Sequence, residues 1–215
     1  MLGTRPRILI AEDHIFLAEL CKKLLDGEFV VIGIVTDGRA MVRQATRLRP
    51  DVILVDVAMP TLNGLDAGRQ VKKILPGTKL LYLSMKNDPE IVAEALRFGA
   101  SGYMLKTCAS SQLIVAVREI LRGKTYMSPT LPRERIGYLR RQNASSVKSA
   151  ARLPEREREV LQLLAEGKCM KEVGAVLNVA TRTVAFHKYR MMERIGASTS
   201  ADLVRFAVEN HIVAA

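Results

Sequence analysis

The chain has 215 residues, of which 48% are hydrophobic and 26% charged, and its formal net charge at pH 7 is +11. This composition excludes a chain that is disordered throughout, and the length favours two small domains over one large domain. No apolar run approaches the roughly 18 residues that a membrane-spanning helix needs, and the start of the chain lacks a signal-peptide pattern, so we expect a cytoplasmic protein with no membrane partner.

The positive charge is concentrated in the middle of the chain, where residues 123–152 carry seven Lys or Arg and one Asp or Glu. This excess fits a polyanionic partner such as nucleic acid, and it fits a solvated linker equally well. The cysteines Cys21, Cys108 and Cys169 lie far apart and have no metal-ligand spacing. They are therefore interpreted as ordinary thiols in a reducing compartment.

From Arg7 to about Arg122, apolar strand-like runs alternate with helical patterns. Five such repeats predict a parallel sheet with helices on both faces. The predicted strands are Ile8–Ala11, Val30–Val35, Val52–Asp56, Leu80–Ser84 and Gly102–Leu105, and the predicted helices that follow them are 14–25, 38–48, 65–75, 89–98 and 110–122.

Polar residues stand where these strands end. Glu12 and Asp13 follow the first strand, Asp56 ends the third, Ser84 ends the fourth and Lys106 follows the fifth. An isolated Asp56 would most often be a turn cap, but the carboxyl ends of parallel strands lie along one edge, so these groups should converge there. Three neighbouring carboxylates repel one another unless a cation lies among them, and oxygen ligands favour Mg²⁺. Lys106 would pair with an incoming phosphoryl group.

Five separated motifs, in order and spacing, resemble a bacterial response-regulator receiver domain over roughly residues 5–122. They are Glu12-Asp13, Val55-Asp56-Val57-Ala58-Met59-Pro60 with Asn63-Gly64, Leu83-Ser84, and Gly102-Tyr103-Met104-Leu105-Lys106. The resemblance implies a flavodoxin-like, five-stranded parallel sheet with strand order 2-1-3-4-5. It implies phosphorylation of Asp56 by a sensor histidine kinase, with Mg²⁺ held by Glu12, Asp13, Asp56 and the backbone carbonyl of Ala58.

The same resemblance implies that Ser84 and Tyr103 form a switch pair, the hydroxyl turning to the phosphoryl oxygen and the ring moving inward behind it. Two departures are visible: Glu12 stands where many relatives have Asp, and Lys106 precedes Thr107 where many have Pro. His14 follows the acidic pair, but a lone His at a helix start is more often a surface residue, so it is left out of the predicted metal ligands.

Residues 123–150 contain prolines and weak periodicity, which favours an interdomain linker with a possible short helix at 133–141. After Leu153-Pro154 the pattern is wholly helical, with predicted helices up to Gly167, at 170–177, at 181–195 and near 200–210. Four helices with a tight break before the third are typical of a helix-turn-helix.

The helix predicted at 181–195 has two distinct faces. At 100° per residue, Met191 and Ile195 fall on the same side as Val184, whereas Phe186 and Tyr189 fall opposite, together with Arg182 and Glu193. The outward face is too aromatic for a solvated one. Four Lys or Arg oppose one Glu in this helix, as a DNA-reading helix requires.

Motifs over about 63 residues of this second half resemble the LuxR-type domain of the NarL/FixJ subfamily. They are Leu153-Pro154-Glu155-Arg156-Glu157-Arg158-Glu159-Val160-Leu161, Ala165-Glu166-Gly167, Lys171-Glu172-Val173, Thr183-Val184 with His187, and Ile195-Gly196-Ala197. The resemblance implies that helix 181–195 enters the major groove and that a homodimer binds inverted half-sites.

By position on that helix, the residues expected to face base edges are Ala185, Phe186 and Tyr189. Those expected to contact phosphates are Arg182, Thr183, His187, Lys188 and Arg190. Ala185 departs from the Lys or Arg often found there, which replaces a guanine contact by apolar contact with a thymine methyl group. His187 could instead be a helix-packing residue.

These observations predict a phosphorylation-switched transcription regulator with a receiver domain at 1–122, a basic linker at 123–150 and a DNA-binding domain at 151–215. One alternative is a regulator that binds DNA regardless of phosphorylation and uses its receiver for protein contacts. Another is an aspartyl-phosphate enzyme, but such enzymes need a second carboxylate beside the nucleophile, and residue 58 is Ala. We therefore expect no enzyme activity beyond self-catalysed phosphorylation and dephosphorylation of Asp56.

Overall fold

The computed structural model describes residues 5–108, 110–141 and 153–213. The chain divides into two compact units, the first formed mainly by residues before 143 and the second mainly by residues from 143 onward. We call them unit 1 and unit 2 and describe each by itself. Among the described residues, no helix has the length and apolar character needed to cross a bilayer.

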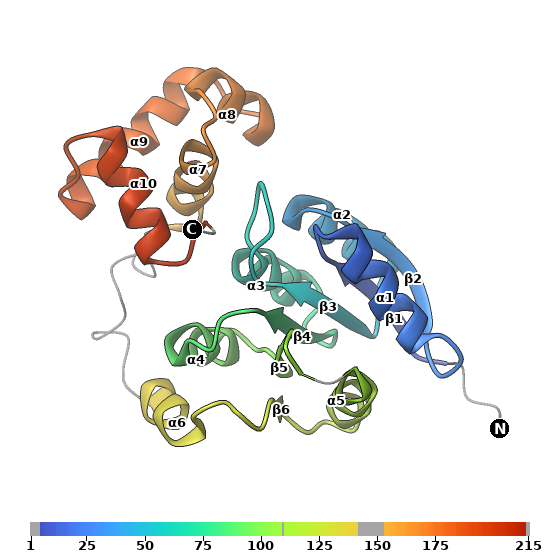
Figure 1. The fold of residues 1–215 in the computed structure, drawn as a ribbon. Coiled ribbons are helices and arrows are strands. Elements are labelled where there is room, and N and C mark those ends of the chain that lie inside the picture. Colours follow the sequence, from blue (N-terminus) through green and yellow to red (C-terminus); the bar gives the residue numbers. More distant parts are fainter. Residues whose placement is uncertain (1–4, 109, 142–152, 214–215) are drawn as a thin grey trace. The chain divides into compact units, whose positions relative to one another are not determined.

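Unit 1 contains a parallel sheet with the strand order β2-β1-β3-β4-β5-β6 (Figure 1). The strands are β1 (Arg7–Ala11), β2 (Val30–Val35), β3 (Val52–Asp56), β4 (Lys79–Ser84), β5 (Gly102–Leu105) and β6 (Tyr126–Met127). The predicted strand order 2-1-3-4-5 is confirmed, but the sheet has six strands rather than the predicted five. The added strand is two residues long and pairs with the outer edge of β5.

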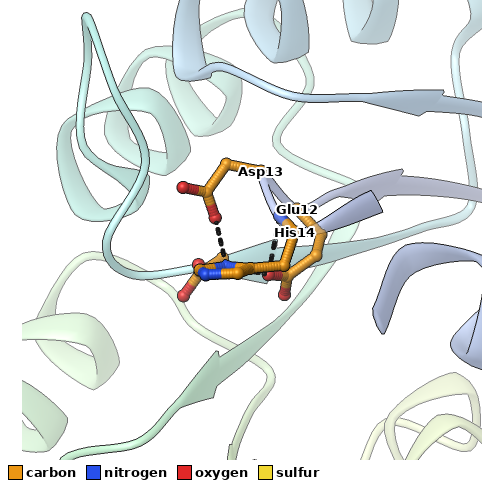
Figure 2. A group of neighbouring side chains, drawn as sticks. Glu12, Asp13 and His14 are labelled. Carbon is orange, nitrogen blue, oxygen red and sulfur yellow. Dashed lines mark hydrogen bonds and ion pairs between the residues drawn. The ribbon is translucent and has the colours of Figure 1, made fainter. Parts of the chain in front are cut away.

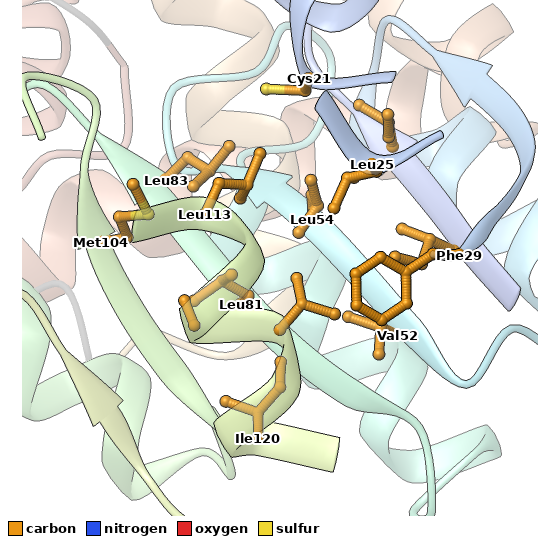
Figure 3. Close-up of a cluster of buried hydrophobic side chains, with 14 of the residues drawn as sticks. Cys21, Leu25, Phe29, Val52, Leu54, Leu81, Leu83, Met104, Leu113 and Ile120 are labelled. Carbon is orange, nitrogen blue, oxygen red and sulfur yellow. The ribbon is translucent and has the colours of Figure 1, made fainter. Parts of the chain in front are cut away.

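Five helices connect the strands and cover both faces of the sheet. They are α1 (Ile15–Leu25), α2 (Gly38–Leu48), α3 (Gly64–Ile74), α4 (Pro89–Arg97) and α5 (Ser111–Leu121). Helices α1 and α5 lie together against one face, where their apolar side chains meet those of β1, β3 and β4 (Figure 3). On the opposite face, α3 comes so close to β4 that only the glycine at position 68 leaves room for the side chain of Tyr82.

The core of unit 1 explains why the apolar runs of the sequence are uninterrupted. Every residue of β3 is buried, and Ile8, Leu9 and Ile10 of β1 are fully buried. Alternate residues of a strand point to opposite faces, so a strand covered by helices on both sides needs apolar residues at every position. Asp56 is the exception in β3, at the end of the strand.

Part of the segment predicted as a linker packs onto unit 1. Besides β6, residues Arg133–Arg141 form α6, the short helix expected there, which packs against α4. Leu131, just before α6, and Ile136 within it are buried, with exposures of 3% and 1%. Residues 142–150 of the predicted linker lie outside the described residues. The two-residue strand has too little periodicity to be seen in the sequence, and the sequence of the short helix does not show that it packs on unit 1.

Unit 2 is all-helical, as predicted, with four helices in its described part. They are α7 (Glu155–Ala165), α8 (Met170–Leu177), α9 (Thr181–Ile195) and α10 (Ser200–Glu209). Two apolar clusters hold them together. One joins α7, α9 and α10 around Leu161 and Met191, and the other joins α7, α8 and α9 around Val160 and Val184. Helix α9 contributes to both clusters through one face.

The break between α8 and α9 is tight because two backbone features allow it. Asn178 ends α8 in the left-handed conformation, with φ of 54°, which Asn tolerates better than most residues. A Cβ atom at Gly174 would lie 2.8 Å from the carbonyl oxygen of Val179, so only glycine permits the chain to fold back there. This is the turn expected of a helix-turn-helix.

Candidate functional site

Asp56 lies at the carboxyl end of the buried strand β3, and its residue is 3% exposed. Helix α3 begins almost directly behind it, because the backbone N–H of Gly64 donates to the carbonyl of Val57 at 2.9 Å. A Cβ atom at Gly64 would stand 2.0 Å from the carbonyl oxygen of Asp56. Glycine at position 64 is therefore required for this arrangement, which gives a steric reason for Gly64 in the Asn63-Gly64 motif.

Lys106, just after β5, contacts residues at the ends of two other strands. Its ammonium lies 2.9 Å from Oε1 and 2.8 Å from Oε2 of Glu12, and 3.0 Å from Oδ2 of Asp56. The side chains of Lys106, Glu12 and Asp56 are 9%, 1% and 4% exposed, so the three charges interact with little screening by water. The convergence predicted for Glu12, Asp56 and Lys106 is present in the structure.

For both Glu12 and Lys106, burial and the contact between the two groups shift the pKa in opposite directions. Burial is the main cause that raises the pKa of Glu12; the negative charge of Asp56 adds to it, and Lys106 opposes it. For Lys106, burial lowers the pKa, but the hydrogen bond with Glu12 and the charge of Asp56 outweigh burial and hold the pKa above its ordinary value. Lys106 is therefore a stable cation facing two carboxyl groups.

Asp13 and His14 lie beside Glu12 and Asp56, and His14 was not among the predicted metal ligands. Ligand atoms of Glu12, Asp13, His14 and Asp56 all lie within 4.8 Å of one another. Figure 2 shows the His14 ring beside the two acidic residues, with Nδ1 2.9 Å from Oδ1 of Asp13 and 3.3 Å from Oε1 of Glu12. The charge of Asp13 raises the pKa of the exposed His14. Its position directly after Glu12-Asp13 was the signal that could have placed it here.

The predicted switch residues are close to each other. Ser84 is buried at the end of β4, and its Oγ accepts a hydrogen bond from the backbone N–H of Lys86 at 3.0 Å. The Tyr103 ring is fully buried, and its hydroxyl donates to the carbonyl of Lys86 at 3.5 Å. Burial raises the pKa of Tyr103 to about 12, partly offset by a hydrogen bond with Ser84. Tyr103 thus lies inside the fold.

The backbone around Asp56 supplies further polar groups. The N–H of Ala58 donates to Oδ1 of Asp56 at 3.2 Å, and Ala58 itself is exposed. The site therefore combines three carboxylates, an exposed backbone segment and one ammonium at the rim of the sheet. Such a pocket of hard oxygen donors is compatible with a divalent metal ion.

In unit 2, the two faces of α9 follow the sequence prediction. Val184 and Met191 are fully buried. On the other side Phe186 and Tyr189 are 57% and 64% exposed, and Arg182 is exposed with them. Exposing two aromatic rings on one helix face is costly in water, which is typical of a surface that binds a partner.

The remaining residues predicted to contact DNA differ in exposure. Arg190 is exposed, and its guanidinium lies 5.8 Å from the centre of the Phe186 ring. The half-buried residues are Thr183, Ala185, His187 and Lys188. The His187 ring packs edge-on against Phe186, with 5.6 Å between ring centres.

One residue of this surface was not predicted. Glu157 of α7 is 2% exposed, and its carboxylate lies 3.3 Å from Nε of Arg194 and 3.9 Å from Nε of Arg190. The carboxylate therefore restrains two cations of α9 from the neighbouring helix. In the sequence Glu157 stands between two other glutamates that look like a solvated face, so no local pattern distinguishes it.

Comparison with known proteins agrees with these two units. Residues 8–118 match the response regulator receiver domain, and residues 151–207 match the luxR family of bacterial regulatory proteins. Oxygen regulatory protein NreC of Staphylococcus aureus is 31% identical over 214 residues, covering 96% of this chain and 99% of NreC.

Two solved structures are also similar. RcsB from Salmonella enterica serovar Typhimurium, bound to promoter rprA in the presence of the phosphomimetic BeF3-, is 27% identical, with a TM-score of 0.59 and coverage of 94% of this chain and 98% of that one. A LuxR-family two-component response regulator from Aurantimonas sp. is 25% identical, with a TM-score of 0.59 and coverage of 65% and 100%.

A parallel α/β unit with an acidic site at its strand ends, followed by a helix-turn-helix unit, is the architecture of a DNA-binding signalling protein. The chain belongs to the response regulators that combine a receiver domain with a LuxR-type DNA-binding domain, and it is a transcription regulator of that family.

Proposed function

We propose that phosphorylation of Asp56 by a sensor histidine kinase switches sequence-specific DNA binding by α9. The observation that carries this proposal is the placement of the Lys106 ammonium, 2.8 Å from Glu12 and 3.0 Å from Asp56 within a pocket of three carboxylates. The ammonium is in direct ion-pair contact with the carboxylate that would act as the nucleophile. The same cation offers a partner to an incoming phosphoryl group.

In the proposed reaction a carboxylate oxygen of Asp56 attacks the phosphorus atom of a phosphohistidine. The new O–P bond forms as the N–P bond breaks, and the electron pair returns to the imidazole nitrogen of the kinase. The chain itself positions the reacting groups, which is the main task of a protein in phosphoryl transfer. Transfer from small phosphodonors and slow hydrolysis of the product are the only self-catalysed steps that we assign to it.

The donor set fits Mg²⁺. Glu12, Asp13 and Asp56 supply hard carboxylate oxygens within 4.8 Å of one another, and the exposed Ala58 would add its backbone carbonyl. When bound, the ion would neutralise the repulsion between the Asp56 carboxylate and the phosphoryl oxygens. The imidazole of His14 also reaches this group of ligand atoms.

Phosphorylation adds close to two negative charges and three acceptor oxygens at Asp56. Ser84 and Lys106 are the hydrogen-bond donors at neighbouring strand ends that such a group would attract. Release of the Ser84 hydroxyl from the Lys86 N–H would change the surroundings of Tyr103, whose hydroxyl bonds the carbonyl of the same Lys86. In this proposal Ser84 and Tyr103 would link the phosphoacceptor to the segment that leads into α4.

The partners we propose are DNA and a second copy of this chain. Helix α9 would enter the major groove, with Ala185, Phe186 and Tyr189 toward base edges. The predicted phosphate contacts are Arg182, Thr183, His187, Lys188 and Arg190. A homodimer on inverted half-sites would pair two such helices. The protein would be cytoplasmic, with a receiver at 1–122, a segment at 123–150 whose described part packs on the receiver through β6 and α6, and a DNA-binding domain at 151–215.

The test measures promoter-DNA binding before and after treatment with acetyl phosphate and Mg²⁺, for the native chain and for Asp56→Asn. We expect tighter binding only for the phosphorylated native chain. Asp51→Asn is the matched control, because Asp51 lies just before β3 at the opposite end of the strand, where it accepts a hydrogen bond from Arg7. This variant should respond to acetyl phosphate as the native chain does.

Equal DNA affinity in all arms, with Asp56 phosphorylated in the native chain, would contradict the switch. That result would favour a regulator that binds DNA independently of phosphorylation.

A further inference from the structure

Ser128 follows β6, in the segment that leads away from the sheet edge, and it is fully buried. Its Oγ accepts a hydrogen bond from the backbone N–H of Leu105 at 2.9 Å and lies 3.1 Å from Sγ of Cys108. Leu105 and Cys108 are the two ends of a turn closed by a Cys108 N–H to Leu105 carbonyl bond of 3.0 Å. Lys106 lies inside this turn, so one hydroxyl contacts both of its ends.

The backbone of the same segment is hydrogen-bonded to β5, the strand that carries Tyr103. The N–H of Ser128 donates to the carbonyl of Tyr103 at 3.1 Å, and Met127 pairs with Tyr103 in the register of β5 and β6. The N–H of Lys106 in turn donates to the carbonyl of Ser84 at 2.8 Å. The segment around Ser128 therefore contacts the element that carries Tyr103 and Lys106 on the side away from β4.

The chain beyond Ser128 also remains attached to unit 1. Leu131 and Ile136 are buried, and α6 packs against α4, the helix that begins just after Ser84 and Lys86. Residues 126–141 thus contact the turn that carries Lys106 and the helix α4 that follows Ser84 and Lys86 in the chain. They are also the last described residues before the chain enters unit 2.

We infer that Ser128 is a positioning residue for Lys106. By fixing both ends of the Leu105–Cys108 turn, its hydroxyl holds the ammonium between Glu12 and Asp56. Ser128 belongs to the segment that leads to unit 2. This segment therefore contributes to the placement of Lys106 in the phosphoryl-transfer site. This inference rests on the proposed function, and it concerns a residue that never touches the phosphoryl group.

A purely structural role for Ser128 makes a different prediction. Loss of a buried hydrogen bond lowers stability wherever it occurs, because the abandoned donor remains unsatisfied. Thr78 provides the matched control: its buried hydroxyl donates to the carbonyl of Pro50 at 2.9 Å, just before β4 at the opposite end of the strands. Thr78→Val should lower stability about as much as Ser128→Ala without affecting Lys106.

The experiment compares rates of Asp56 phosphorylation by acetyl phosphate and Mg²⁺, measured by intact-protein mass spectrometry on full-length chains at a temperature where each is folded. We expect Ser128→Ala to lower the rate about tenfold, a smaller loss than the roughly hundredfold that a full 1 Å misplacement of a reacting group can cause. Thr78→Val should keep the native rate. Ser128→Thr retains the acceptor oxygen and should keep most of the rate, and Ser128→Cys carries the test if Ser128→Ala does not fold.

Two further readouts separate positioning from stability. Hydrogen exchange of the Leu105 amide, followed by NMR, should speed up in Ser128→Ala and stay unchanged in Thr78→Val. In a Lys106→Met background, Ser128→Ala should leave the remaining phosphorylation rate unchanged, because its effect acts through Lys106.

Native rates in both Ser128→Ala and Thr78→Val, or a further loss from Ser128→Ala in the Lys106→Met background, would overturn the inference. Absence of a phosphoryl group on Asp56 in the native chain would instead refute the proposed function, so the two failures are distinguishable.

Discussion

Replacement of Lys106 by Met should destabilise unit 1 in a way that depends on Mg²⁺ and on pH. The ammonium lies within 3.0 Å of carboxylate oxygens of both Glu12 and Asp56, whose side chains are 1% and 4% exposed. Removing one partner of a buried ion pair leaves an uncompensated charge and costs on the order of 3 kcal/mol. At about 4 °C per kcal/mol for a unit of this size, the midpoint of thermal unfolding should fall by roughly 12 °C.

The ionic origin of this loss gives two further signatures. Millimolar Mg²⁺ should restore much of the stability of Lys106→Met, because a bound cation replaces the missing charge and binds only the folded state. Burial already raises the pKa of Glu12, so its protonated form favours the folded state. Without the lysine the pKa of Glu12 should rise further on folding. The stability that Lys106→Met loses should therefore be small at acidic pH and increase as the pH rises through the pKa of Glu12 in the folded state.

The assay is thermal denaturation followed by circular dichroism, at several pH values, with and without Mg²⁺. Lys124→Met is the matched control: Lys124 lies 2.8 Å from Glu119, but this pair is exposed, at 65% and 26%, and should contribute little. A deficit in Lys106→Met that is the same at every pH and Mg²⁺ concentration would refute the electrostatic reasoning. So would a deficit no larger than that of the control.

Three other outcomes follow from single contacts. Maleimide should label the exposed Cys169 quickly at pH 7 and spare Cys21, whose burial raises its pKa to about 11, until the chain unfolds; equal labelling rates by mass spectrometry would contradict this. Gly64→Ala should lower the free energy of unfolding by about 3 kcal/mol, because its Cβ would stand 2.0 Å from a carbonyl oxygen at the end of β3, and an unchanged urea midpoint would disprove that clash. Tyr189→Ala should weaken DNA binding at all salt concentrations, whereas Arg182→Ala should reduce the salt dependence by about one counterion; titrations at three ionic strengths test both, and identical slopes would argue against a phosphate contact by Arg182.

The sequence was sufficient to predict the parts of the fold that repeat. Five apolar runs, each followed by a helical pattern, correspond to β1–β5, because a strand buried on both faces must be apolar throughout. The convergence of Glu12, Asp56 and Lys106 was predictable for a related reason. Once the sheet is parallel, the residues at its strand ends have to meet at one edge.

What the sequence did not reveal depends on tertiary contacts. The strand β6 has only two residues, and its pairing with β5 leaves no periodic signal. Serine is a common turn residue, so Ser128 does not stand out in the sequence. Its role depends on the backbone N–H of Leu105, which reaches it only in the folded chain. Glu157 lies among charged neighbours in the sequence but becomes buried against Arg194 when α7 packs on α9. These residues share one property, that their partners are distant in sequence.

The two faces of α9 also bear on how this protein can diverge. Val184 and Met191 anchor the helix in both apolar clusters of unit 2, whereas Phe186 and Tyr189 make no contribution to either cluster. Under the proposed function, substitutions on the outer face would change what the helix recognises while leaving the fold nearly as stable as before. A duplicated copy of the gene could acquire new target sites through a few such substitutions, without the compensating changes that a buried position would demand.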